Sequence, residues 1–220
     1  MLRFTGYGSL LFLLAGAVSQ AGAQLHHFTV EAQGGGPIGG ALARTPFFTQ
    51  VLAQDSLNGT VVSFTGTVEI SSDGPLLSGG GTSASFSGGI LASHSVNFSS
   101  GGLYTLTATN SAGAESGVSD TFTSSNPLPQ ISLLSPSSRT AGDTGFTLTI
   151  TGTNFTPVSS VLFAGSARPA FFLNDSQLTA SITAAAIDTA GVFTVEVSSP
   201  APGGGTSNQA AFTVSEPVLR

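Results

Sequence analysis

The feature that most limits what this chain can fold into is an alternating run in its second half, Phe146-Thr147-Leu148-Thr149-Ile150-Thr151. Apolar residues occupy every second position and threonines stand between them, which is the pattern of a strand with one face in a core and the other in water. Gly152 and Asn154 follow, and both residue types tolerate a positive φ. The chain can therefore turn and return Phe155 to the core. We predict a central strand of a β-sandwich that ends in a turn and a buried aromatic plug.

The first 23 residues have the organisation of a secretory signal peptide. Arg3 precedes an apolar run at 10–18, and the small residues Ala21-Gly22-Ala23 predict cleavage before Gln24. An uncleaved membrane anchor is the alternative, but the apolar run is shorter than the roughly 20 residues that a spanning helix needs. We expect a mature protein that is secreted or lies at the cell surface, without membrane insertion after cleavage.

Composition excludes several classes of function. Charged residues make up 7% of the chain, against roughly 25% in ordinary globular proteins. The chain has five arginines, no lysine and a formal net charge of −6, so it offers no basic surface for nucleic acid. It also has no cysteine, so each domain must be held by its core without disulfides.

An internal repeat predicts two domains of one plan. The segment 102–108, Gly-Leu-Tyr-Thr-Leu-Thr-Ala, is echoed at 191–197, Gly-Val-Phe-Thr-Val-Glu-Val, and each copy is followed by a closing strand, at 120–123 and 211–214. Between the copies, Asn126-Pro127-Leu128-Pro129 predicts a short, stiff joint that keeps the domains extended with limited bending. The predicted division is a signal peptide at 1–23, a first domain at 24–125, a proline linker at 126–129, a second domain at 130–216 and a tail at 217–220.

Short strands separated by turn residues are predicted throughout both domains. Those of the first domain are 28–32, 47–54, 61–64, 67–71, 93–98, 103–109 and 117–123. Those of the second are 130–134, 146–151, 160–163, 169–173, 177–182, 192–198 and 210–214. The glycine-rich segments 34–40 and 79–81 are predicted to be loops between strands, because neither precedes a helix or carries the lysine of a phosphate-binding loop. Tyr104 stands where a tyrosine corner occurs in immunoglobulin-like sandwiches, which indicates a structural role.

The second half contains an ordered series of short motifs. They are Pro129-x-Ile131-x-x-Leu134-x-Pro136, Ala141-Gly142, Phe146 to Phe155, Val161-x-Phe163-x-Gly165, Gln177-Leu178-Thr179-Ala180, Ala190-Gly191, and Pro200 to Asn208 before Phe212. Together they resemble the IPT/TIG domain over its whole length. The resemblance implies an immunoglobulin-like Greek-key β-sandwich for this domain. Together with the internal repeat, it leads us to predict an all-β chain of two tandem immunoglobulin-like Greek-key β-sandwiches after the signal peptide.

The first domain resembles a bacterial immunoglobulin-like repeat more loosely. The resemblance is carried by Phe47-Phe48-Thr49-Gln50-Val51, by Thr65-Gly66-Thr67-Val68 and by the strand of Tyr104, whereas the long loop at 34–40 departs from the pattern. It implies a secreted, bacterial surface-type protein. Domains of these kinds serve as spacers, stalks and interaction modules, so the fold does not give the function.

No catalytic residue is predicted. A nucleophile needs a base beside it, and the imidazoles of this chain are those of His26, His27 and His94. His94 lies in a predicted strand among serines, where a strand-surface histidine is the simpler interpretation. The acidic residues are scattered, and Ser72-Asp73-Gly74 and Asn174-Asp175-Ser176 are typical of turns.

The N-terminus that cleavage would create is a candidate metal site. A free amine at Gln24, two amide nitrogens and the imidazole of His26, with Leu25 between them, form a square-planar set for Cu(II) or Ni(II). Cyclisation of Gln24 or cleavage one residue away would remove it. No other metal site and no cofactor is predicted, because the chain has no dense acidic loop of the calcium-binding type.

The pairs Phe47-Phe48 and Phe171-Phe172 are the candidate contact patch, because adjacent residues of a strand face opposite sides. The alternative is that both rings are buried, one in a core and one at the domain interface. Sugar-binding surfaces usually present flat aromatic rings, and this chain has no tryptophan.

These observations favour a non-enzymatic secreted or cell-surface protein that acts as a spacer or protein-binding module. The alternative is an accessory, carbohydrate-associated module that works with a polysaccharide-degrading enzyme, which an exposed row of phenylalanines on one sheet would favour. The expected partner is an unknown extracellular protein or wall polymer, bound at an exposed sheet edge that few charges protect. The oligomeric state is left open.

Overall fold

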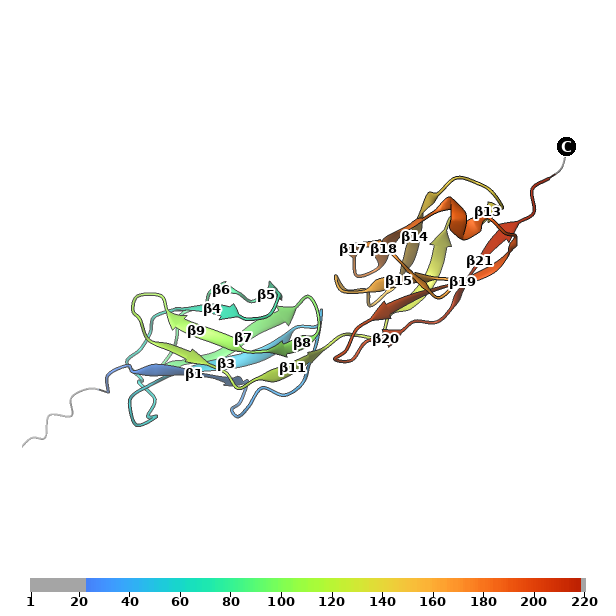
Figure 1. Ribbon diagram of the computed structural model, residues 1–220. Helices are drawn as coiled ribbons and strands as arrows, with labels where there is room; N and C mark the ends of the chain where they lie inside the picture. Colours follow the sequence, from blue (N-terminus) through green and yellow to red (C-terminus); the bar gives the residue numbers. More distant parts are fainter. Residues whose placement is uncertain (1–22, 219–220) are drawn as a thin grey trace, which may run out of the picture.

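A computed structural model of the chain describes residues 23–218 and shows two β-sandwiches joined end to end (Figure 1). The predicted signal peptide lies outside the described residues except for Ala23. Besides strands, the described part contains one short 3₁₀ helix, η1 (Ala184–Ile187). None of its helices has the length and apolar character needed to cross a membrane.

The first sandwich packs one four-stranded sheet against a second four-stranded sheet and a three-stranded one. The first sheet has the order β1 (His27–Ala32), β3 (Phe47–Gln54), β7 (Ile90–Phe98) and β5 (Leu76–Ser78). The opposite layer consists of β10 (Ser116–Val118), β9 (Leu106–Asn110), β4 (Val68–Ser72) and β6 (Gly81–Thr82), and of β2 (Ala41–Leu42), β11 (Phe122–Ser125) and β8 (Gly102–Tyr104).

The second sandwich has two complete sheets. One has the order β12 (Gln130–Ser135), β14 (Phe146–Thr153), β18 (Gln177–Ile182) and β17 (Ala170–Asn174). The other has the order β13 (Ser138–Thr140), β21 (Ala210–Ser215), β19 (Gly191–Ser199), β15 (Ser160–Phe163) and β16 (Ser166–Arg168), with β20 (Gly205–Thr206) paired to β19.

Both sandwiches follow the immunoglobulin plan. In each, the short second strand runs parallel to the last strand, β2 beside β11 and β13 beside β21. The repeat seen in the sequence is also kept in the strand register, because Tyr104 pairs with Phe122 where Phe193 pairs with Phe212. The second domain has the ABED and CFG sheets of an immunoglobulin sandwich. The predicted fold class is therefore confirmed.

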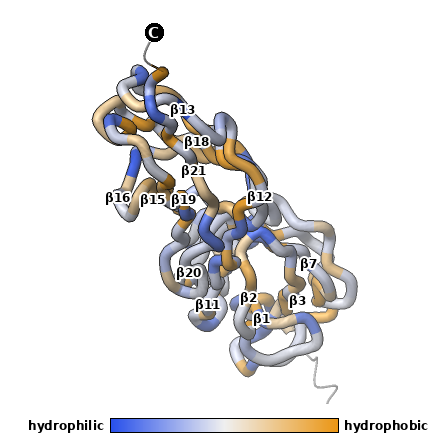
Figure 2. The backbone as a smooth tube through the Cα atoms, turned by 90° about the vertical axis from the view of Figure 1, so that its right-hand side faces the viewer, coloured by the Kyte–Doolittle hydropathy of each residue, from blue (hydrophilic) through white to orange (hydrophobic). Residues whose placement is uncertain are grey.

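Each sandwich has its own core. The buried apolar residues form two clusters, one between Phe28 and Phe122 and one between Ile131 and Val214. In Figure 2 the apolar stretches appear in both sandwiches, around β1 and β3 in the first and along β12 and β18 in the second. No residue belongs to both clusters, so the core does not run through the proline linker.

The central alternating run forms β14, as predicted. Leu148, Ile150 and Phe155 are fully buried, and Asn154 adopts the expected positive φ of 66°. A positive φ was also expected at Gly152, but its φ is not positive. Its missing side chain instead allows close approach, since a Cβ there would collide with the carbonyl oxygen of Gln130.

Three predicted strands of the first domain were wrong in part. The segment 61–64 is a turn, and 103–109 and 117–123 are each broken into two strands. Side chains take the backbone groups of Thr105 at the first break: its N–H donates to the carboxylate of Asp73 (2.7 Å), and Ser72 Oγ donates to its carbonyl (2.6 Å). Such local side-chain bonds compete with the ladder and end it.

Tyr104 forms the predicted corner. Its hydroxyl donates to the carbonyl of Gly101 (3.0 Å), three residues upstream. Its ring stacks on that of Phe98, with 4.6 Å between centroids. The tyrosine therefore fastens the entry of β8 to the core and is not available as a contact residue.

Candidate functional site

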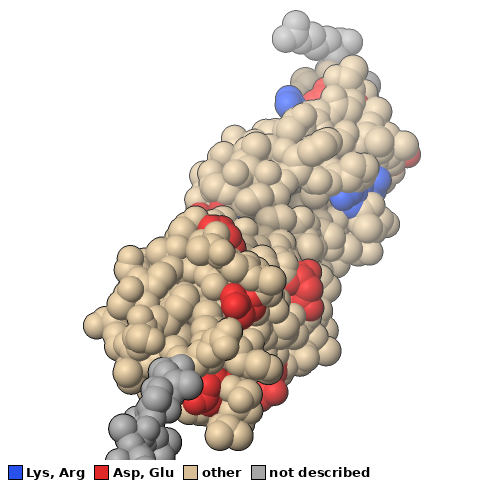
Figure 3. Space-filling view, turned by 90° about the vertical axis from the view of Figure 1, so that its left-hand side faces the viewer, with Lys and Arg blue, Asp and Glu red and all other residues tan. Residues whose placement is uncertain are grey.

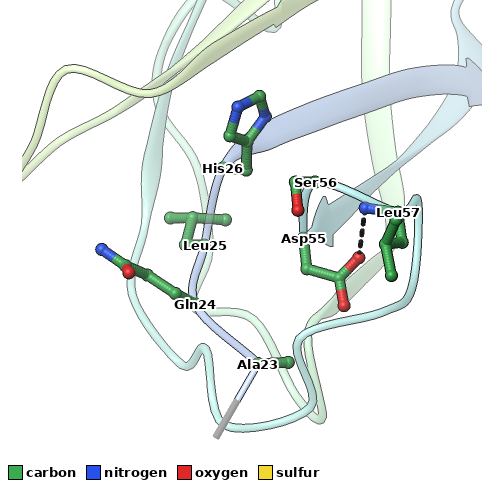
Figure 4. Close-up of a pocket in the computed structure, with 7 residues that line it drawn as sticks. All are labelled: Ala23, Gln24, Leu25, His26, Asp55, Ser56 and Leu57. Carbon is green, nitrogen blue, oxygen red and sulfur yellow. Dashed lines mark hydrogen bonds between the residues drawn. The ribbon is translucent and has the colours of Figure 1, made fainter. Parts of the chain in front are cut away.

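One pocket lies at the beginning of the described chain. It has a volume of about 420 Å³ and is lined by residues 23–26 and 55–57 (Figure 4). Asp55 Oδ1 accepts hydrogen bonds from the N–H groups of Gly59 and Leu57, each at 2.8 Å. These two bonds lower the pKa of Asp55 below its usual range. The carboxylate therefore serves its own turn and is an acceptor rather than an acid.

The square-planar metal site at Gln24, Leu25 and His26 stays a prediction, and a metal there would compete with one backbone hydrogen bond of His26. The amide N–H of His26 donates to the carbonyl of Gln54 (2.8 Å), immediately before the ladder between β1 and β3 begins. The metal would need that nitrogen deprotonated, so binding would break this hydrogen bond. Within residues 23–218, no group of three or more His, Cys, Asp or Glu side chains is placed to hold a metal ion.

His94 has a structural partner. Its Nε2 lies 2.7 Å from the carbonyl oxygen of Gly79, in the loop that the sequence identified as glycine-rich. Gly79 has a φ of 90°, and a Cβ there would collide with the backbone of Ser95. The imidazole thus holds a tight loop against β7, and among the described residues no hydrogen bond joins it to a carboxylate.

The two phenylalanine pairs divide between core and surface. Phe47 and Phe172 pack against the two cores, whereas Phe48 and Phe171 are 52% and 69% exposed. These are the two exposed phenylalanines of residues 23–218, and they lie in different domains. They form no row of rings on one sheet.

The surface carries few charges, as Figure 3 shows for one face. Each arginine of the described chain lies over an aromatic ring: Arg44 over Phe172, Arg139 over Phe146 and Arg168 over Phe163, at 5.2, 4.9 and 5.9 Å from the ring centroids. Cation–π contacts of this kind keep the guanidinium against the protein. The positive groups are therefore engaged in the fold.

Three serines close interruptions in the strands in the same way, which the sequence did not reveal. Ser83, Ser119 and Ser207 each accept a backbone N–H with Oγ at 2.9–3.0 Å and donate the hydroxyl to the next residue's carbonyl at 2.8 Å. All three are buried. Their neighbours in the sequence share no motif, and serine is common in this chain, so no signal marked them.

The described residues form a tandem of immunoglobulin-like sandwiches. The side chains of His94, Asp55 and the arginines make contacts within the protein. Residues 129–214 match the family model of the IPT/TIG domain. This match confirms the resemblance seen in the sequence of the second half. The resemblance of the first half to a bacterial immunoglobulin-like repeat stays a prediction. No curated protein matches this chain in sequence.

Solved structures with related folds include bacterial adhesins. The Yersinia pseudotuberculosis adhesin InvE is 13% identical with a TM-score of 0.49, over 85% of this chain and 58% of that structure. Invasin, described as a bacterial integrin-binding protein, is 19% identical with a TM-score of 0.44, over 85% of this chain and 39% of that one. The chain thus spans a little over half the length of the adhesin InvE.

Proposed function

We propose that this protein is a non-enzymatic, secreted or cell-surface protein in which two immunoglobulin-like sandwiches act as a spacer and as a protein-binding module. The observation that carries the proposal is the engagement of the candidate chemical groups. His94 is bonded to a backbone carbonyl, Asp55 to its own turn, and the described arginines lie over rings. What the molecule offers to a partner is shape and exposed strand edge.

The binding edge that we propose is β17 of the second domain. β17 lies at the edge of its sheet and exposes Phe171 and Leu173. Ser181 N–H donates to the carbonyl of Pro169 (3.1 Å), so the backbone groups of Pro169 and, two residues on, of Phe171 face β18. The N–H groups of Ala170 and Phe172 therefore point to the open side of β17. An extended segment of a partner protein can add there as a further strand.

A matched pair of variants tests this edge. Binding of the purified protein to intact cells, culture proteins and isolated wall polymers is measured by pull-down. Phe171→Ser is expected to weaken capture of a protein partner, and Val192→Ser, at a site of equal exposure (70% against 69%) on the other sheet, is expected to preserve it. Ala170→Pro removes an outward N–H without touching the pairing with β18, so it should weaken capture as well.

The carbohydrate-associated alternative predicts a different result. It requires capture by wall polysaccharide that survives protease treatment of the polymer and is lost on removal of exposed rings. One exposed phenylalanine in each domain, at Phe48 and Phe171, provides little flat apolar area for a sugar chain. Capture of polysaccharide by the native chain would refute the protein-binding proposal, and so would equal capture by all three variants.

A further inference from the structure

One linker residue, Asn126, is hydrogen-bonded to both sandwiches. Asn126 is buried, and its backbone N–H donates to the carbonyl of Pro202 (2.7 Å), while its carbonyl accepts from Gly204 N–H (2.7 Å). Its Nδ2 donates to the carbonyl of Pro200 (2.8 Å), and its Oδ1 accepts from Gly101 N–H (2.8 Å). Three of these four bonds cross to the second domain, and the fourth returns to the first.

A second contact between the domains lies on the other side of the chain at Ser125 and Asn126, where β11 leads into the linker. Neighbouring residues of a strand direct their backbone groups to opposite edges, and the carbonyl of Ser125 accepts from Ala43 N–H (2.9 Å). This bond places Arg44 beside the linker, with its guanidinium 5.2 Å from the centroid of Phe172 in the second domain. Contacts on both edges of the linker therefore oppose bending in either direction.

We propose that these contacts lock the two sandwiches into one rigid body, with Asn126 as the clamp that sets the angle between them. This replaces the limited bending expected from the prolines alone. Each hydrogen bond contributes roughly 1 kcal/mol net, so the three crossing bonds of Asn126 favour the locked state about 100-fold. The proposal is separate from the proposed function, because the angle belongs to the protein without a partner.

Glycine substitutions offer a matched test of the clamp. A Cβ at Gly203 would meet the carbonyl oxygen of Asn126 at 2.5 Å and Ser125 Cβ at 2.8 Å, so Gly203→Ala pushes the linker away from the second domain. Gly142→Ala is the control in the same domain. It has a similar positive φ (83° against 68°), and nothing lies within 4 Å of the added methyl group. Both variants carry the same kind of backbone strain, and one of them disturbs the joint.

The readout is the distribution of distances between one spin label in each domain. The chain has no cysteine, so cysteines introduced at the exposed positions Leu57 and Leu133 take up the labels specifically. We expect one narrow distribution for the native joint and for Gly142→Ala, and a broad distribution for Gly203→Ala. A broad distribution for the native joint would overturn the proposal, as would equal widths for the two variants.

A second measurement applies if Gly203→Ala does not fold. Asn126→Ala removes two side-chain hydrogen bonds but leaves the backbone pair, and hydrogen exchange of the Gly204 amide reports opening of the joint. One of these two bonds, from Nδ2 to the carbonyl of Pro200, crosses the joint. Its loss is expected to increase that exchange about fivefold, or about 1 kcal/mol at 1.4 kcal/mol per tenfold change. Unchanged exchange at Gly204 would show that Asn126 is not the clamp.

Discussion

Replacing Phe155 by alanine tests whether the plug after β14 holds the second sandwich together. The ring is fully buried in the second core and lies against the space left by Gly152. Truncation of a buried phenylalanine costs about 3–5 kcal/mol in unfolding free energy. A domain of this size has about 5–15 kcal/mol in total, and each kcal/mol corresponds to roughly 4–8 °C in melting temperature. We expect Phe155→Ala to lower the melting temperature of the second domain by about 12–40 °C.

The two domains can be followed separately in a urea titration. Tyr104 is the one tyrosine after residue 22 of the sequence, so tyrosine fluorescence reports the first domain, while circular dichroism reports both. Phe155→Ala should lower the midpoint of the dichroism transition more than that of the fluorescence transition. The control is Phe171→Ala in the same domain, which removes an exposed ring and should change stability by less than about 0.5 kcal/mol. A loss below about 1 kcal/mol for Phe155→Ala, or equal losses for both variants, would refute the reasoning.

Three further predictions concern the first domain. Tyr104→Phe removes the bond to Gly101 and should cost about 0.5–1.5 kcal/mol in chemical denaturation, and an unchanged midpoint would contradict the corner. Gly117→Ala places a methyl group on the backbone of Phe28, so the domain should lose the exchange protection of β1, whose retention would disprove this close approach. Asp55 should titrate below its usual range by NMR, because two N–H groups stabilise the carboxylate. Since its folded pKa is lowered, its contribution to stability is present above the unfolded pKa and disappears as the pH falls through the folded value.

The sequence predicted the second domain better than the first, for a physical reason. In the second domain the alternation is regular, and the predicted bounds of β15 and β18 agree with the structure. In the first domain the alternation near Thr105 continues through a position whose backbone bonds go to side chains of a distant turn. Periodicity describes which face of a strand is apolar, but it cannot show that a remote carboxylate takes over a ladder position.

The candidate site could be predicted only in part. Adjacent phenylalanines indicated that one ring of each pair would face outward, and Phe48 and Phe171 are the exposed members. The sequence could not show that Arg44, far from Phe172 along the chain, covers that ring from the other domain. The prolines of the linker likewise indicated stiffness, but the bonds of Asn126 depend on a loop that lies more than seventy residues later.

The serines that close the strand interruptions have a consequence for the environments in which the fold can persist. Ser83, Ser119 and Ser207 hold their positions with hydroxyl groups that neither ionise nor attract counterions. Acidification or added salt weakens contacts between charged groups, yet leaves such neutral bonds in place. A framework closed in this manner, and free of oxidisable thiols, should keep its shape in media that differ widely in salinity, acidity and redox state.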